Sequence, residues 1–198
     1  MYGLLGKGTM AAHAHTHTDT PHTHTDTNKT LNRGWNLYGQ LGQGTTADAY
    51  APMPVRYFLE VGAKARRVCC GEGFSVVVCS EGEGGGGGEL YSFGHNHQGQ
   101  LGLGYTWATS TSHTPQHVRL PTPPPTPHSA EEAALDYSQE TTVARVYALD
   151  VACGGNHTLV VRTSDSSPAE VFAWGANGEG QAKFLKSILH IDCIDCIK

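Results

Sequence analysis

Five histidines near the start of the chain alternate mainly with threonines, and two aspartates lie among them. Imidazole nitrogens bind Zn²⁺, Cu²⁺ and Ni²⁺, so this run is a candidate for weak metal binding. The same composition is also typical of disordered low-complexity sequence, which is too polar to bury a core. We favour the second interpretation and expect no resident metal. The residues concerned are His13, His15, His17, Asp19, His22, His24 and Asp26.

Two cysteines near the end of the chain, Cys193 and Cys196, have the C-x-x-C spacing of zinc knuckles and thioredoxin-type dithiols. A structural zinc requires a second pair of ligands, and the nearest candidate, His190, supplies one at most. A redox dithiol of this type is expected near a βαβ pattern, which the surrounding sequence does not show. We therefore interpret both residues as ordinary thiols in a tail, 182–198, whose apolar residues recur at helical spacing.

Three other cysteines, Cys69, Cys70 and Cys153, lie beside short apolar runs. Free cysteine behaves as a small hydrophobic residue when it is buried. We therefore expect these three side chains to be buried on inner strands and to be unreactive.

The remaining candidate for catalysis is His157, which has Asn156 beside it and Asp150 nearby. These residues would permit a triad, but no serine lies in a nucleophile-elbow motif. The sequence also contains no phosphate-binding loop, no HExxH motif and no dinucleotide fingerprint. We interpret His157 as a structural residue. We expect no catalytic, cofactor-binding or metal-binding residues, no cofactor, and a protein that is not an enzyme.

Composition and charge narrow the class of protein. Glycine accounts for 25 of the 198 residues, too many for a helical bundle, and the chain has no triplet period of the collagen type. The net charge of −5 lacks the basic excess of a phosphate-neutralising protein, so we expect no nucleic-acid partner. No apolar run is long enough to span a bilayer, and the first thirty residues carry no secretory signal. We expect a cytoplasmic protein, with the nucleus as the alternative.

A repeat organises the middle of the chain. The pattern aromatic-Gly-x-Asn-x-x-Gly-Gln-Leu-Gly recurs, with departures, at 33–42, 93–102 and 174–181. A Cys-Gly pair followed by an apolar run precedes two of these copies, at 68–78 and 151–161. Glycine supplies positive φ and asparagine tolerates the same conformation, so the pattern predicts tight turns.

The apolar runs are expected to be strands. Residues 74–79 and 157–162 are short, β-branched and bounded by turn residues, as buried strands are. Each should pair as a hairpin with the strand that follows it, at 90–93 and 171–174. The leucines that follow the Gly-Gln pairs should anchor the turns in the core.

These paired motifs resemble the repeat of the regulator of chromosome condensation family over residues 31–181. The resemblance implies a seven-bladed β-propeller made of four-stranded antiparallel blades. It therefore predicts an all-β fold, an incomplete propeller of two to three blades. Seven such blades require about 350 residues, so we expect this chain to be a fragment of a longer protein.

The domain organisation follows from the repeat. Residues 1–30 form a low-complexity segment, in which 2–9 resembles a remnant of the same turn. Residues 31–181 hold the repeats, with a proline-rich insertion at about 121–140. Residues 182–198 have no repeat character, and their pattern favours a helix.

Two functions are compatible with the resemblance. The first is a non-enzymatic scaffold that presents its loops to a protein partner, as most members of the family do. The alternative is guanine-nucleotide exchange on a small Ras-like GTPase, the activity of the family's founder. Open blade edges would also allow self-association.

Overall fold

The computed structural model describes residues 13–17, 29–80, 88–104, 110–122, 145–165 and 167–180. These residues form antiparallel strands and one short helix. Within this part of the chain, no helix is long and apolar enough to cross a membrane.

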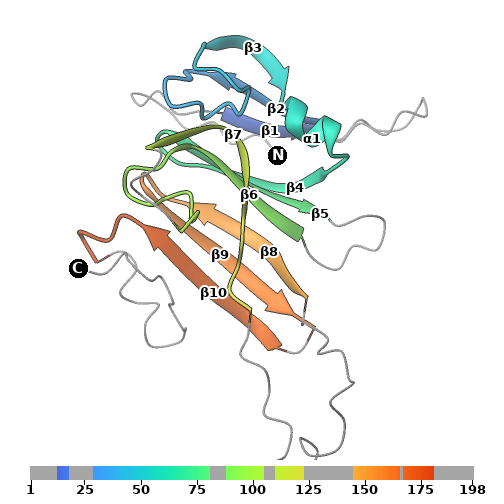
Figure 1. Cartoon of the computed structure of the whole chain (residues 1–198), viewed down its shortest axis with the longest axis vertical. Coiled ribbons are helices and arrows are strands. Elements are labelled where there is room, and N and C mark those ends of the chain that lie inside the picture. The colour runs from blue at the N-terminus through green and yellow to red at the C-terminus, as the bar shows by residue number, and fades with distance from the viewer. Residues whose placement is uncertain are drawn as a thin grey trace, which may run out of the picture.

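The strands form a three-stranded sheet and a seven-stranded sheet, and in the latter a single pair, Gly88 opposite Ala148, joins β6 to β8. We divide the seven-stranded sheet at this pair, which gives three successive groups, called blades 1, 2 and 3, from top to bottom in Figure 1. Blade 1 contains three strands, which are β1 (His13–His17), β2 (Lys29–Gly34) and β3 (Ala49–Pro54). Helix α1 (Arg56–Glu60) then leads into blade 2. Blade 2 has four strands, which are β4 (Lys64–Cys70), β5 (Phe74–Ser80), β6 (Gly88–His95) and β7 (Thr111–Val118). Blade 3 has three strands, which are β8 (Val146–Cys153), β9 (His157–Ser164) and β10 (Ser167–Gly175).

The predicted hairpins form. Strands β5 and β6 pair antiparallel from Phe74 opposite Gly94 to Ser80 opposite Gly88. Strands β9 and β10 pair in the same way, with Gly175 opposite His157. The all-β class and the incomplete antiparallel propeller are therefore confirmed. Blade 2 has all four strands, and the described parts of its neighbours have three each.

Strand β1 differs from the expectation for the histidine-rich segment. We expected this segment to lack regular structure, but His13–His17 pair antiparallel with β2, from His13 opposite Arg33 to His17 opposite Lys29. Threonine favours strands, and pairing satisfies the backbone polar groups of both segments. The rest of 1–28, including the 2–9 turn remnant, lies outside the described residues, as do most of the 121–140 insertion and the 182–198 tail.

Blade 2 is covered on both faces. Because side chains alternate along a strand, Phe74, Val76 and Val78 of β5 face a core shared with blade 3, and Val77 and Cys79 face a core shared with α1 and the preceding Val55. All five side chains are buried. This arrangement explains why the run is continuously apolar, because neither face of β5 meets solvent.

Candidate functional site

The repeated turns share one hydrogen-bonding scheme. In blade 1 the amide oxygen of Asn36 accepts a bond from the backbone N–H of Leu41 at 2.9 Å, and that of Gln40 accepts one from the N–H of Tyr38 at 2.9 Å. In blade 2, Asn96 and Gln100 make the equivalent bonds at 3.1 and 2.8 Å. All four polar side chains are fully buried. The asparagines and glutamines of the motif therefore hold the turns together and are not available for chemistry.

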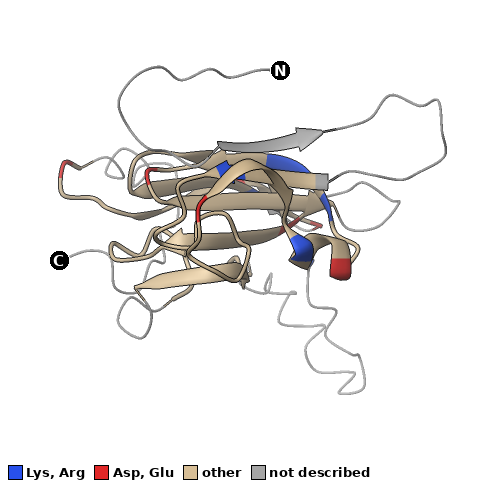
Figure 2. Cartoon of the chain, turned by 90° about the horizontal axis from the view of Figure 1, so that it is seen from above, with Lys and Arg blue, Asp and Glu red and all other residues tan. Residues whose placement is uncertain are grey.

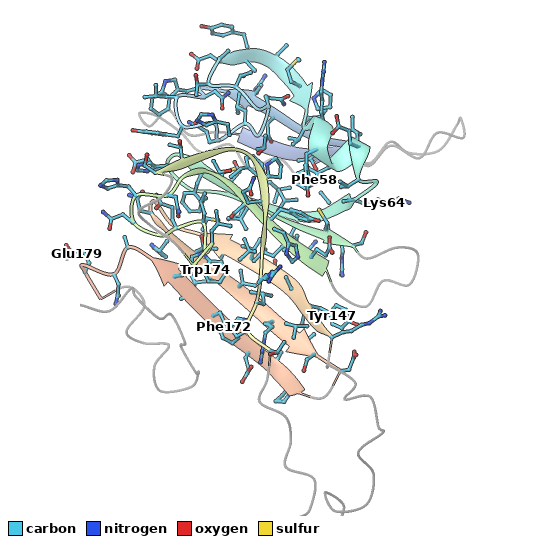
Figure 3. All side chains as sticks on the ribbon, in the orientation of Figure 1. Phe58, Lys64, Tyr147, Phe172, Trp174 and Glu179 are labelled. Atoms are coloured by element: carbon cyan, nitrogen blue, oxygen red, sulfur yellow. The ribbon has the colours of Figure 1, made fainter. Side chains whose placement is uncertain are left out.

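Each of these two turns also accepts hydrogen bonds from the next blade. The hydroxyl of Ser75 in blade 2 donates to the backbone carbonyl of Gln40 in blade 1 at 2.8 Å. One repeat later, Thr158 in blade 3 donates to the carbonyl of Gln100 at 2.9 Å, and the indole N–H of Trp174 donates to the same oxygen at 3.0 Å. Trp174 points back toward blade 2, and Glu179 lies at the turn end of blade 3 (Figure 3). The turns thus fix how successive blades stack.

The variable positions of the same turns carry a row of rings, which we call the ring ladder: Trp35, Tyr38, His95 and His97. Trp35 and Tyr38 meet edge to face, with centroids 5.4 Å apart. Tyr38 of blade 1 stacks on His95 of blade 2 at 4.3 Å, and His95 stacks on His97 at 6.0 Å. Three of these side chains are half-buried, and His97 is exposed. Beside them, Leu37 is 54% exposed although it is apolar.

Polar groups of three turns meet at the ladder. The side-chain N–H₂ of Gln100 lies 3.1 Å from Nδ1 of His95 and donates to the amide oxygen of Asn156 in blade 3 at 3.2 Å. Asn156 in turn donates to the carboxylate of Glu72 at 3.5 Å. Burial, assisted by the neighbouring His97, lowers the pKa of His95, and Glu72 opposes this shift. The neutral imidazole of His95 is therefore the favoured form in this surface.

Comparison with known proteins now identifies the repeat. The family model described as the regulator of chromosome condensation (RCC1) repeat matches residues 33–78 and 87–126, and a second model of that description matches 149–181. Together these ranges cover more than half of the chain. The chain belongs to the RCC1-repeat family. The resemblance drawn from its turn motifs is confirmed.

One curated relative of this RCC1-repeat chain is the protein RCC2 homolog of Danio rerio, which is 34% identical over 152 residues, or 75% of this chain and 27% of the relative. Two solved structures are also similar, each with a TM-score of 0.46, 18% identity and 74% of this chain covered. They are human WBSCR16, of which 28% is covered, and yeast RCC1 (Prp20) bound to Kap60, of which 25% is covered. The chain therefore spans about a quarter of the length of these relatives.

The metal candidates of the RCC1-repeat chain fall mostly outside the structure. His22, His24, Asp19 and Asp26 lie outside the described residues, as do Cys193, Cys196 and His190. Among the residues that are described, no group of three or more histidine, cysteine, aspartate or glutamate side chains could hold a metal ion.

The triad candidates take part in other contacts. A carboxylate oxygen of Asp150 accepts a bond from the N–H of Val151 at 2.9 Å and lies 3.4 Å from Nε of Arg67. Asn156 bonds Gln100 and Glu72, as described above. The contacts of Asp150 and Asn156 described above are with residues other than His157, and most of them join blade 3 to blade 2.

The cysteines depart from the expectation. Cys69 and Cys70 end β4 and Cys153 ends β8, the first strands of their blades, but all three are half-buried and not fully enclosed. The fully buried thiol is Cys79 on β5, and burial raises its pKa to about 12. The sequence alone did not predict that Cys79 is more buried than Cys69 and Cys153, because the burial of these side chains depends on how the blades stack.

Sequence reasoning also missed the ring ladder, because it treated the positions between the glycines and asparagines as unspecified. The signal was present in the aligned copies. Trp35 and His95 occupy one such position, and Leu37 and His97 occupy another, so large side chains recur where turn chemistry does not require them.

Proposed function

We propose that this chain is a non-enzymatic protein-interaction scaffold, and that its partner binds the ring ladder and the adjoining Leu37. The observation that carries this proposal is the continuous ring stack across the boundary between blades 1 and 2. Tryptophan and tyrosine are enriched among the residues that dominate binding energy at protein interfaces. Rings that are already held by one another also lose little conformational entropy on binding.

The charge pattern favours a partner that binds through apolar and hydrogen-bonding contacts. Lys and Arg positions are few along the ribbon (Figure 2), and the three that lie together, Lys64, Arg66 and Arg67, are on β4. The ladder includes the exposed imidazole of His97, and the exposed carboxylate of Glu72 lies close to His95. Loops held by a rigid scaffold commonly carry binding specificity, which suits a surface built from turns on buried strands.

A photo-crosslinking experiment tests the surface. A photoreactive phenylalanine analogue is placed at Leu37, and in a matched control at Tyr50, which is 93% exposed on β3 and outside the ladder. We expect the same protein to be crosslinked repeatedly from position 37 in cells and not from position 50. Equal crosslinking from both positions would contradict the proposal.

Affinity then tests the residues. With the captured partner purified, the double variant Tyr38→Ala/His97→Ala should weaken binding at least tenfold, and Tyr50→Ala should leave it within twofold. Circular dichroism of each variant establishes that the fold is retained. Unchanged affinity in the folded double variant would remove the ladder from the interface.

The alternative within the same family is guanine-nucleotide exchange on a small Ras-like GTPase. An exchange factor acts on its GTPase through binding contacts and supplies no covalent chemistry. The ladder, as the proposed binding surface, is therefore also the surface to test for this function. A Ras-like GTPase loaded with fluorescent GDP is mixed with the purified chain, and nucleotide release is followed over time. Release faster than in buffer, and slower with Tyr38→Ala/His97→Ala, would support exchange. Release at the buffer rate would leave scaffolding as the function.

We further propose an intracellular location in the cytoplasm or nucleus, to be checked by imaging a fluorescent fusion. Self-association through exposed strand edges also remains a prediction. Sedimentation velocity at several concentrations tests it, because a concentration-independent monomer would contradict it.

A further inference from the structure

Two cysteines of different blades lie on neighbouring strand ends. Cys69, near the end of β4, and Cys153, at the end of β8, are close enough for each thiol to shift the pKa of the other. The two residues are 84 positions apart in the sequence, and both are half-buried. The contact joins the first strands of blades 2 and 3, so it depends on the packing of the two blades.

Contacts on both sides hold this pair in place. On one side, Arg67 of β4 and Asp150 of β8 form an ion pair at 3.4 Å. On the other side, the backbone N–H of Glu72 donates to the carbonyl of Gly155 at 2.9 Å. Along the two chain segments, the Arg67–Asp150 pair lies before the cysteines and the Glu72–Gly155 bond lies after them, so both cysteines are bracketed by contacts between blades 2 and 3.

The environment also makes the two thiols chemically unequal. The hydrogen bond from the Cys153 thiol, together with the backbone N–H groups of Cys153 and Cys70, lowers the pKa of Cys69 to about 7, although burial and Asp150 oppose this. The same hydrogen bond, and burial, raise the pKa of Cys153. Near neutral pH a substantial fraction of Cys69 is therefore thiolate, the form that acts as a nucleophile.

We propose that Cys69 and Cys153 are a redox-modification site, a dithiol that a hydroperoxide converts reversibly into a disulfide between blades 2 and 3. The Cys69 thiolate attacks one oxygen of hydrogen peroxide, the O–O bond breaks, and the products are a sulfenic acid and hydroxide, which takes up a proton to give water. The sulfur of Cys153 then attacks the Cys69 sulfur. An S–S bond forms, the S–O bond breaks, and hydroxide leaves with the proton of Cys153 as a second water.

The reverse step needs a reducing thiol such as glutathione, which attacks one sulfur of the disulfide and releases the other. The disulfide would link two blades that otherwise adhere through non-covalent contacts. Closing a loop of this length restricts the unfolded chain and should raise the melting temperature of the oxidised form by roughly 5–10 °C.

Peptide mapping tests the site in the full chain. Cys193→Ser and Cys196→Ser are introduced first, because that pair could form a disulfide of its own. The reduced protein is treated with a small excess of hydrogen peroxide, free thiols are blocked with N-ethylmaleimide, and peptides are analysed without reduction. We expect a crosslinked peptide that contains Cys69 and Cys153, that disappears with dithiothreitol, and that accompanies the rise in melting temperature.

The matched variants are Cys69→Ser and Cys70→Ser, which change neighbouring residues of the same strand. We expect the crosslink to persist in Cys70→Ser and to fall below a tenth of the parental yield in Cys69→Ser. A crosslink of undiminished yield in Cys69→Ser would overturn the assignment. Recovery of Cys69 and Cys153 only as separately blocked or overoxidised residues would overturn the disulfide itself.

A second measurement needs no substitution at the pair. Iodoacetamide at pH 7 should alkylate Cys69 at least ten times faster than the fully buried Cys79, and the Cys69 rate should rise with a midpoint near pH 7. Equal rates at the two residues would contradict the proposal even if a variant failed to fold.

Discussion

At the scale of single residues, the two buried glutamines of the turns differ in how fully they are hydrogen bonded. The side-chain N–H₂ group of Gln100 reaches His95 and Asn156. The matching neighbours of Gln40 are Trp35 and Gly73, which offer no side-chain acceptor. The Nε2 atom of Gln40 is consequently buried without a hydrogen-bond partner among the described residues.

This difference leads to the first prediction. Gln100→Leu should lower the free energy of unfolding by about 1–2 kcal/mol more than Gln40→Leu, because only the former breaks bonds made by the N–H₂ group. Urea unfolding monitored by tryptophan fluorescence measures both values. Equal losses would mean that the bonds from Gln100 to His95 and Asn156 contribute nothing net.

His95 leads to the second prediction, on pH. Burial and the charge of His97 lower its folded-state pKa, with Glu72 opposing, so the unfolded chain binds the proton more readily. The contribution of His95 to stability is thus present above pH 6.5, the ordinary pKa of histidine, and is lost as the pH falls below it. Urea unfolding at pH 7.5 and 5.5 should show a smaller loss in His95→Gln than in the parent protein. An equal loss in His95→Gln and in the parent protein would mean that protonation of His95 does not affect stability.

At the scale of elements, the turn glycines do two different things. Gly102 has φ +67° and lies against the next blade, so that an added Cβ would come within 2.6 Å of the Trp174 ring. Gly104 has φ +74° but faces open space. The first glycine is needed for both its conformation and its close approach, and the second only for its conformation.

The third prediction uses this pair. Gly104→Ala should cost about 1–2 kcal/mol from the left-handed conformation alone. Gly102→Ala should cost about 1–3 kcal/mol more, because the methyl group also displaces Trp174 from its packed position. Thermal unfolding of both variants measures the difference. A Gly104→Ala loss as large as that of Gly102→Ala would show that the inter-blade contact is unimportant.

The elements also show how far the sequence predicts the structure. The hairpins at 74–93 and 157–174 were predictable because β-branched runs and turn glycines are local signals. Strand β1 was not, since its polar residues form a strand only through pairing with β2. The ladder contact of Tyr38 with His95 and the thiol contact of Cys69 with Cys153 were also beyond reach. Both join residues of different blades, and their distances depend on how blades stack.

At the scale of the whole molecule, blade 2 shares one core with blade 3 and a second core with α1, the helix that follows blade 1. Phe58 of α1 belongs to the second core, and Leu101 belongs to the core with blade 3. Each is almost completely buried. Stability in repeat architectures is close to a sum of unit and neighbour terms, so damage to one core should be felt mainly by the elements that share it.

The fourth prediction follows from this arrangement. Phe58→Ala should cost about 3–5 kcal/mol locally. Hydrogen exchange should then lose protection in β4, β5 and β6 while β9 and β10 retain most of theirs. Leu101→Ala is the matched variant, and it should expose β9 and β10 as well as β5. Uniform loss of protection in both variants would indicate a single cooperative unit.

The strand directions have a consequence for how such chains vary in length. Ser80 and Val118 pair with Gly88 and Leu90, at the end of β6 that lies away from His95 of the ladder. The segments that follow Ser80 and Val118 therefore begin at strand ends opposite the ladder. Residues inserted at those ends would lengthen one rim, the blade ends opposite the ladder. The other rim, which carries the ladder, would be unchanged. The two rims are therefore free to diverge separately. A tag or reporter inserted between Ser80 and Gly88 would label the molecule without changing the rim that we assign to recognition.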